Sequence, residues 1–202
     1  MAEILILNGS PRAPRSNSKR YAGLFVHSYP GESEYREITR SNHAELCEKM
    51  AEFSDVLLIF PLYADGLPVT LLNFLKSLEA NPPARKPVIS VLINCGFFEY
   101  RQNDIAVRMV ELFCRQNGYR FGSVLEVGSG EAILDTPFCA LVRRKVKQLA
   151  QAIVQGQHRM LDVTMPLTRG MFVRASTRYW LGYGKKNGIG RDEMARMEIE
   201  GE

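Results

Sequence analysis

The sequence lacks the features that mark several large classes of protein. It has only four cysteines, and no two of them form a C-x-x-C pair: Cys47, Cys95, Cys114 and Cys139. Zinc ribbons, iron–sulfur clusters and disulfide scaffolds need closer spacing, so we expect reduced thiols and no metal site. No stretch approaches the ~20 apolar residues that a membrane-spanning helix requires, and no secretion signal opens the chain. We therefore expect a soluble, cytoplasmic protein without a membrane span.

A strong charge excess and the common nucleotide-binding signatures are missing as well. Lys and Arg number 26 against 22 Asp and Glu, a net charge of +4, which is too small to indicate nucleic-acid binding. The basic stretch 143–147 lies in a predicted helix with an apolar opposite face, which favours a solvated surface. After the first predicted strand there is neither G-x-G-x-x-G nor G-x-x-x-x-G-K-[ST], which counts against dinucleotide-binding Rossmann domains and P-loop NTPases.

The sequence instead shows short aliphatic runs that alternate with stretches of helical period. Such runs are typical of strands buried on both faces of a parallel sheet. Strands are expected at 3–7, 56–60, 88–93 and 123–127, with a weaker one at 35–38, and helices at 17–27, 42–53, 69–78, 104–117 and 137–155. This alternation predicts a doubly wound, three-layer α/β sandwich with a five-stranded parallel sheet in the order 2-1-3-4-5. Ligands of such sheets lie at the carboxyl ends of the strands.

The composition changes after residue 155, where methionines and aromatic residues are interspersed with arginines and lysines. We expect residues 1–155 to form the ligand-binding domain and residues 156–202 to form a C-terminal helical extension with an amphipathic helix at 168–182. The extension could form a lid, join subunits or lie on a membrane surface. Packing on the core or on a partner subunit is favoured.

The loop at residues 8–18, between the first strand and the first helix, has the composition of an anion site. No acidic residue occurs from Ile4 through Gly31, whereas four cations crowd the start of the helix: Arg12, Arg15, Lys19 and Arg20. Each exposed cation there opposes the helix dipole at a cost of about 0.3–1 kcal/mol, which a bound anion would reverse. Hydroxyls, an amide and the free N–H groups of the first helical turn would bind the same anion. The alternative is that Ser16 or Asn17 only caps the helix and the arginines are solvated.

This loop, Asn8-Gly9-Ser10-Pro11-Arg12 followed by Ser16-Asn17-Ser18, resembles the phosphate loop of the NADPH-dependent FMN reductases of the flavodoxin-like superfamily. The resemblance covers about residues 3–155 and implies a flavodoxin-like fold. It also implies that the FMN phosphate is bound by Ser10, Arg12, Arg15, Ser16, Asn17 and Ser18.

Two further loops resemble the parts of that family that contact the isoalloxazine ring. Residues 60–68 follow the third strand, and the resemblance implies ring contacts from Pro61, Leu62, Tyr63 and Ala64. The alternative is a plain turn with a core tyrosine. After the fourth strand, ring contacts are implied for Asn94, Cys95, Gly96 and Phe97. A single glycine before two phenylalanines departs from the family's glycine-rich loop, and either ring could occupy the face above the flavin.

Cys95 and Arg101 also match the C-x5-R spacing of cysteine phosphatases. That chemistry needs a loop of N–H groups that wraps a phosphate around a thiolate of low pKa. Bulky Phe97 and Phe98 and acidic Glu99 suit such a loop poorly. Cys95 is therefore expected to be a small buried hydrophobic residue.

The resemblance implies an FMN-dependent NAD(P)H oxidoreductase that forms a homodimer or homotetramer. NADPH or NADH would deliver hydride to FMN, and a small-molecule electron acceptor would follow: a flavin, quinone, azo or nitro compound, or a metal ion. Since the flavin carries the redox chemistry, no catalytic side chain is expected. The main alternative is a flavin-binding electron carrier or redox sensor without NAD(P)H activity, and a remote one is the cysteine phosphatase. Flavodoxins proper tend to be strongly acidic, so a basic chain favours the reductase.

Overall fold

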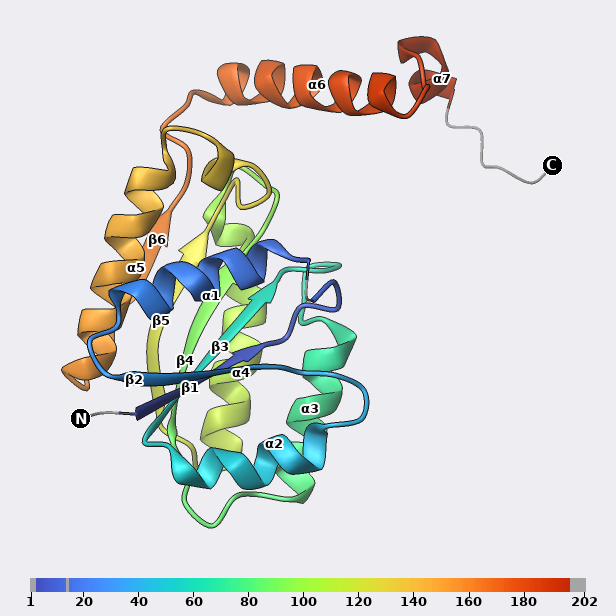
Figure 1. Ribbon diagram of the computed structural model, residues 1–202. Helices are drawn as coiled ribbons and strands as arrows, with labels where there is room; N and C mark the ends of the chain where they lie inside the picture. Colours follow the sequence, from blue (N-terminus) through green and yellow to red (C-terminus); the bar gives the residue numbers. More distant parts are fainter. Residues whose placement is uncertain (1–2, 14, 197–202) are drawn as a thin grey trace. The chain divides into compact units, whose positions relative to one another are not determined.

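The computed structural model describes residues 3–13 and 15–196, and it divides the chain into two compact units, residues 1–165 and 166–202. The first unit is an α/β sandwich built on one parallel sheet (Figure 1). The strands are β1 (Glu3–Asn8), β2 (Glu32–Glu37), β3 (Asp55–Pro61), β4 (Val88–Asn94), β5 (Phe121–Val127) and β6 (Met160–Val163). They lie in the order β2-β1-β3-β4-β5-β6. The predicted order of the first five strands and the flavodoxin-like arrangement are therefore confirmed.

Helices cover both faces of this sheet. They are α1 (Asn17–Ser28), α2 (His43–Lys49), which a short 3₁₀ turn continues to Glu52, α3 (Val69–Ala80), α4 (Asp104–Gln116) and α5 (Cys139–Val154). Helices α2, α3 and α4 share one buried cluster with alternate residues of the strands, and α1 packs beside α5. Successive strand residues point to opposite faces, and Ile4, Leu5, Ile6 and Leu7 are all fully buried. Burial on both faces explains why the strands appear in the sequence as unbroken aliphatic runs.

The prediction of five strands is wrong, because β6 forms a sixth. Its residues Met160–Val163 pair in parallel with Val124–Val127 of β5. The strand is short and includes Asp162, and its residues 160–162 are not fully buried, so it lacks the aliphatic pattern that reveals the central strands. An edge strand tolerates such a mixture because one of its sides has no neighbour to pack against. The first unit consequently extends to residue 165, beyond the boundary at residue 155 that composition suggested.

The second unit contains α6 (Arg169–Lys186) and α7 (Arg191–Arg196). Helix α6 begins after Thr168, whose side chain accepts a hydrogen bond from the N–H of Met171, and it is longer than the predicted helix; α7 was not predicted. Tyr179, Trp180 and Tyr183 form edge contacts along α6. Whether this extension packs on the core or on a partner subunit stays a prediction. Among the described residues, no helix is long and apolar enough to span a membrane.

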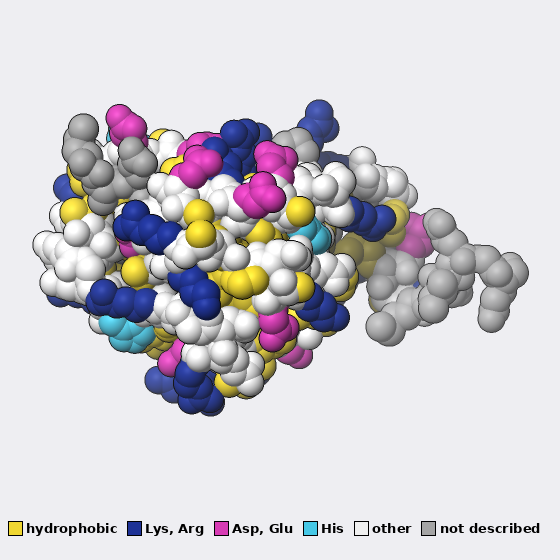
Figure 2. Space-filling view, turned by 90° about the horizontal axis from the view of Figure 1, so that it is seen from below, with side chains coloured by type: hydrophobic (Ala, Val, Ile, Leu, Met, Phe, Trp, Pro, Cys, Tyr) yellow, Lys and Arg dark blue, Asp and Glu magenta, His cyan; other side chains and the backbone are white. Residues whose placement is uncertain are grey.

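The charged side chains are mixed on the face drawn in Figure 2. Among the described residues of that face, Lys and Arg are scattered between acidic and uncharged side chains and do not gather into one patch. This distribution fits the small net charge of +4.

Candidate functional site

A cavity of about 480 Å³ opens where β1, β3 and β4 end. Most of the predicted site residues line it: Ser10, Arg12, Arg15, Ser16, Asn17, Ser18, Pro61, Leu62, Tyr63, Asn94, Cys95 and Gly96. Two predicted residues do not, Ala64 and Phe97. Three residues outside the predicted set also line the cavity, Lys19, Arg20 and Glu131. Three loops that are far apart in the sequence therefore meet at one place, as the parallel sheet requires.

Asn8, the last residue of β1, sets the shape of the first loop. It is fully buried; its Oδ1 accepts a hydrogen bond from the N–H of Ser10 at 2.9 Å, and its Nδ2 donates to the hydroxyl of Tyr35 at 2.9 Å. Ser10 Oγ in turn accepts from the N–H of Arg12. These side-chain bonds to nearby N–H groups turn the chain immediately after the strand. Asn8 is thus a positioning residue that the sequence analysis did not single out.

Ser16 caps the first helix, as the alternative interpretation of the loop supposed. Its backbone is extended, and its Oγ accepts from the N–H of Lys19 at 3.2 Å. A cap satisfies one of the free N–H groups of the first turn and leaves others directed past the helix end. Since the first turn of α1 contains no acidic residue, the cap does not remove the attraction for an anion.

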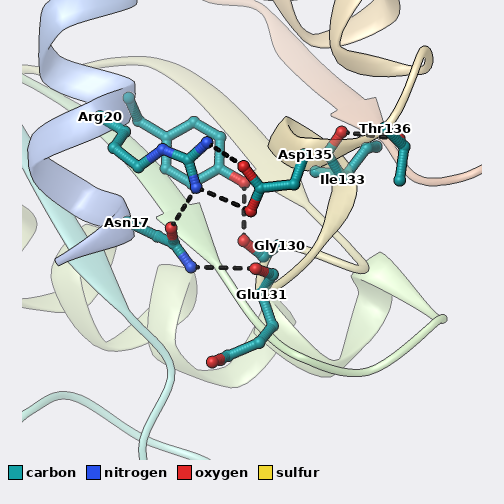
Figure 3. Close-up of polar contacts among 8 residues, drawn as sticks. Asn17, Arg20, Gly130, Glu131, Ile133, Asp135 and Thr136 are labelled. Carbon is teal, nitrogen blue, oxygen red and sulfur yellow. Dashed lines mark hydrogen bonds and ion pairs between the residues drawn. The ribbon is translucent and has the colours of Figure 1, made fainter. Parts of the chain in front are cut away.

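Two of the four cations of the loop, Lys19 and Arg20, have acidic partners, contrary to the sequence-based argument. Arg20 forms a double ion pair with Asp135, with N–O distances of 2.5 and 3.0 Å, and also donates to Asn17 Oδ1 (Figure 3). The hydrogen bond to Asp135 raises the pKa of Arg20, and the same bond lowers the pKa of Asp135. Lys19 lies 3.6 Å from a carboxylate oxygen of Glu37.

Arg12 and Arg15 retain the unbalanced positive charge. Both side chains are exposed, both line the cavity, and within the described part of the chain neither forms an ion pair. The anion-binding argument therefore rests on these two guanidinium groups and on the helix N-terminus.

The loop after β5 completes the site, and the sequence analysis missed it. Asn17 donates to the carbonyl of Glu131 at 3.2 Å (Figure 3), and the buried hydroxyl of Tyr21 donates to the carbonyl of Gly130 at 3.0 Å. The N–H of Gly130 donates to the carbonyl of Cys95 at 2.7 Å. This loop therefore connects α1 to the loop that follows β4. The Gly-Ser-Gly sequence at 128–130 was the available signal, because closely packed backbone favours glycine.

The second loop contains a tight hairpin at its centre. Tyr63 and Gly66 exchange backbone hydrogen bonds of 3.2 and 2.9 Å, and the two residues between them have positive φ, 46° for Ala64 and 55° for Asp65. This is the pattern of a type I′ turn, which usually contains glycine or asparagine. The left-handed conformation costs an alanine about 1–2 kcal/mol. Tyr63 is 39% exposed, so the alternative of a core tyrosine is wrong.

The third loop is held by its backbone and by a buried thiol. The carbonyl of Asn94 accepts from the N–H of Leu62 at 2.8 Å, and Asn94 Oδ1 accepts from the Ser18 hydroxyl at 3.4 Å. Cys95 is 2% exposed and its Sγ lies 3.9 Å from the carbonyl oxygen of Phe97. The ring of Phe97 is half exposed and does not line the cavity, so in this structure it does not cover the site.

Cys95 does not have the environment of a phosphatase nucleophile. Burial raises the pKa of its thiol to about 11, whereas nucleophilic cysteines have a pKa below the ordinary value of a thiol. Arg101 does not line the cavity. The structure therefore argues against the cysteine phosphatase and agrees with the prediction that Cys95 is a buried hydrophobic residue.

We expect Cys95 to be inert toward alkylation at pH 8. With a pKa of about 11, only about one thiol in a thousand is the reactive thiolate at that pH. Iodoacetamide labelling of the folded protein, followed by peptide mass spectrometry, should leave Cys95 unmodified while glutathione in the same tube reacts. Rapid labelling of Cys95, or hydrolysis of an aryl phosphate that Cys95→Ser abolishes, would contradict this assignment.

A buried acidic residue, Glu126, lies in β5 close to the site. Its side chain is 6% exposed, and its neighbour in the register of β6 is Asp162. Burial first, and then the charge of Asp104, raise the pKa of Glu126 to about 7. Arg101 acts in the opposite direction but does not cancel this effect. At neutral pH, close to this pKa, both the protonated and the ionised form of Glu126 are therefore present in the folded protein.

Glu126→Gln is expected to stabilise the protein at pH 8 and to change little at pH 4.5. The folded pKa of about 7 exceeds the ordinary value of 4.5, so the folded state binds the proton more strongly and the unfolding free energy falls between these pH values. Glutamine stays neutral, and pKa values of 4.5 and about 7 in the unfolded and folded states correspond to a gain of about 3 kcal/mol in unfolding free energy at pH 8. Urea unfolding at both pH values measures it, with the exposed Glu79→Gln as the control. An equal effect at pH 4.5 and 8 would contradict the shift.

The site residues fit an elongated molecule with an anionic end and a planar aromatic end. Hydroxyls, the N-terminus of α1 and two unpaired guanidinium groups lie at the first loop, the end that suits a phosphate. Pro61, Leu62 and Tyr63 offer an apolar surface at the second loop, and the backbone of residues 94–96 lines the third. FMN has both of these ends.

Comparisons with known proteins show the fold. No protein-family model and no curated protein matches the sequence. Among solved structures, the chain is similar to an FMN-dependent NADH-azoreductase from Bacillus anthracis str. Ames Ancestor in complex with FMN (14% identity, 76% of this chain and 99% of that chain, TM-score 0.56). It is also similar to a flavodoxin from Streptococcus pneumonia TIGR4 (14% identity, 76% of this chain and 99% of that chain, TM-score 0.56). A third similar structure is an NADPH-quinone reductase from P. pentosaceus (15% identity, 74% of this chain and 98% of that chain, TM-score 0.56). These matches confirm the flavodoxin-like fold and, at that level, the resemblance to flavodoxin-like FMN reductases.

Proposed function

We propose that this protein is an FMN-dependent oxidoreductase that takes hydride from NADPH or NADH and passes the electrons to a small-molecule acceptor. One observation carries the proposal: an open cavity at the carboxyl ends of the strands joins an anion-binding helix N-terminus to an apolar surface. One of the matched structures with this fold, the azoreductase, is in complex with FMN.

The residues of the chain divide into two groups in this proposal. Arg12, Arg15 and the N–H groups at the start of α1 bind the phosphate, with the hydroxyls of Ser10 and Ser18 beside them. Pro61, Leu62 and Tyr63 support the isoalloxazine ring on one side, and the backbone of residues 94–96 borders it. When bound, FMN would supply the redox chemistry: hydride would bring it two electrons and a proton, and the acceptor would take the two electrons together with that proton and one from solvent. The protein binds and orients the flavin and does not need an acid–base pair.

The openness of the site suits exchange of substrates. Tyr63 is 39% exposed and Phe97 is 52% exposed, so neither of these two rings closes the ring end of the cavity. A nicotinamide can therefore leave after hydride transfer and an acceptor can take its place. The matched structures include an azoreductase and a quinone reductase, which supports acceptors of those two chemical classes. A reduced nicotinamide as donor and four unpaired thiols favour a cytoplasmic reaction, and we retain the homodimer or homotetramer as part of the proposal.

Anaerobic reduction tests the proposal directly. The purified full-length protein is incubated with FMN and desalted, and its absorbance spectrum should keep flavin bands in the blue and near ultraviolet. NADPH or NADH should then bleach these bands, and a quinone or azo compound should restore them. Retention of FMN without bleaching by either nicotinamide would show an electron carrier or redox sensor instead. Failure to retain FMN would reject both flavin functions.

A further inference from the structure

A second cavity, of about 600 Å³, lies on the other side of the hairpin at residues 63–66. It is lined by Pro11 of the first loop, by Arg40 and His43 at the start of α2, and by residues of the hairpin and of α3. Tyr63 lines both this cavity and the FMN cavity. Tyr63 is therefore the side chain at which the two cavities adjoin. We call this second space the Arg40 cavity.

Arg40 brings to the Arg40 cavity a positive charge that no other lining side chain opposes. No acidic side chain lines it, and within the described residues Arg40 forms no ion pair. The Nε2 atom of His43 is buried and has no hydrogen-bond partner. A buried polar atom without a partner costs about 1–3 kcal/mol, and a turn of the imidazole toward the cavity would let a ligand accept its hydrogen bond and remove that cost. The ring of His43 packs edge-on against Phe74, with the ring centroids 6.0 Å apart.

The rest of the cavity lining is mostly apolar, with Thr70 and Asn73 as polar residues, and it includes a residue with a strained backbone. Val69 is 71% exposed there, and Leu67 and Pro68 lie beside it. Ala64, which has the positive φ of 46°, lines this cavity and not the FMN cavity. Unfavourable backbone conformations persist where the surrounding structure or a function maintains them. Here the strained turn lies at both cavities: Tyr63 lines both of them, and Ala64 lines the second alone.

We infer that the Arg40 cavity binds the adenosine 2′-phosphate end of NADPH, with Arg40 and His43 as the residues that select NADPH over NADH. The inference rests on the proposed function, which places the nicotinamide ring beside Tyr63. NADPH differs from NADH by one phosphate, and a guanidinium group with an imidazole N–H is suited to binding it. The apolar surface at Leu67 and Val69 suits the adenine. Ala64 is thus a residue of the donor site, and the sequence-based assignment to the FMN ring is replaced by this one.

Direct binding of fragments tests the inference without turnover. Isothermal titration of the FMN-loaded protein compares adenosine 2′,5′-bisphosphate with adenosine 5′-monophosphate, which lacks the 2′-phosphate. We expect the bisphosphate to bind at least about 10-fold more tightly. Arg40→Gln should abolish this difference, and Arg40→Lys should retain part of it because lysine keeps the charge and loses the planar fork. His43→Phe should reduce the difference, since it keeps a ring against Phe74 without the N–H.

The matched control is Arg85→Gln, which removes the same charge from an exposed residue before β4, at the opposite edge of the sheet. It should leave both affinities unchanged. Steady-state kinetics supply the second measurement: Arg40→Gln should lower kcat/KM for NADPH by about 10- to 100-fold and leave that for NADH unchanged. Equal losses for both nicotinamides, or no preference for the bisphosphate in the unmodified protein, would overturn the inference.

The two proposals fail in different ways. If NADPH bleaches the flavin equally well in the unmodified protein and in Arg40→Gln, the reductase stands and the Arg40 inference is wrong. If no nicotinamide bleaches the flavin, the reductase is wrong, and the assignment of this cavity to NADPH falls with it whatever the fragments do.

Discussion

Replacing Arg12 and Arg15 together by glutamine is expected to weaken FMN binding about 100-fold and to leave riboflavin binding unchanged. Both side chains line the cavity and are the cations of the first loop that lack a carboxylate partner among the described residues. A hydrogen bond to a charged group contributes about 1.5 kcal/mol at the low end of its range, which is roughly tenfold in affinity for each arginine. Riboflavin has the same ring without the phosphate, so it should not be affected. Quenching of flavin fluorescence measures both dissociation constants.

A control for total charge is available in α5. Arg143 and Arg144 are exposed and lie outside the cavity, so Arg143→Gln with Arg144→Gln removes the same charge from a different surface. This variant should bind FMN like the unmodified protein. If the variant with Arg12→Gln and Arg15→Gln lost affinity for riboflavin and for FMN to a similar extent, the arginines would support the fold of the loop. The phosphate assignment would then be wrong. Arg20→Gln is not an equivalent test, because Arg20 is already paired with Asp135.

The ion pairs of Arg20 and Lys19 show what the sequence could and could not predict. The local count of charges correctly identified a loop rich in cations, but it treated all four as unopposed. Asp135 is 115 positions from Arg20, and Glu37 belongs to the neighbouring strand β2. Only the fold brings these carboxylates to the helix start. A local charge pattern therefore predicts where an anion could bind, and tertiary structure decides how much charge remains to bind it.

The elements of the fold were predictable where a periodic pattern was long and apolar. The central strands β1, β3 and β4 are buried on both faces, which leaves a nearly continuous aliphatic run in the sequence, and β5 keeps Val124, Leu125 and Val127 of such a run. Strand β6 has four residues and an Asp, and its position is determined by pairing with β5 and not by its own pattern. The loop after β5 was missed for a similar reason. It contributes carbonyl groups and close packing, so the glycines at 128 and 130 are the residue types that signal it in the sequence.

Gly130 in that loop is the site of the second large effect. Gly130→Ala is expected to lower the unfolding free energy by about 2–3 kcal/mol and to impair FMN binding with it. A Cβ at this position would lie 2.9 Å from the Cβ of Asn94 and 3.0 Å from the carbonyl oxygen of Cys95. Neither atom belongs to the end of a flexible side chain, so the loops themselves must move apart. Chemical denaturation of the FMN-free protein measures the stability, and fluorescence titration measures the affinity.

Gly96→Ala is the matched control, because a Cβ there would meet nothing within 4 Å. Its unfolding free energy should stay within about 0.5 kcal/mol of the unmodified value. Equal stability of the two variants would contradict the packing argument for Gly130.

The two largest expected effects separate the charge of the site from its shape. The exposed arginines contribute no packing, so their replacement should reduce FMN affinity while the FMN-free protein keeps its stability. Gly130 contributes packing without charge, so its replacement should reduce both, and the loss should extend to riboflavin because Asn94 and Cys95 border the ring. FMN stabilises the folded protein according to its concentration relative to the dissociation constant. Excess FMN should therefore raise the melting temperature of the unmodified protein more than that of either variant. If the arginine variant lost stability without ligand and the Gly130 variant did not, the division of the site into a phosphate end and a ring end would be wrong.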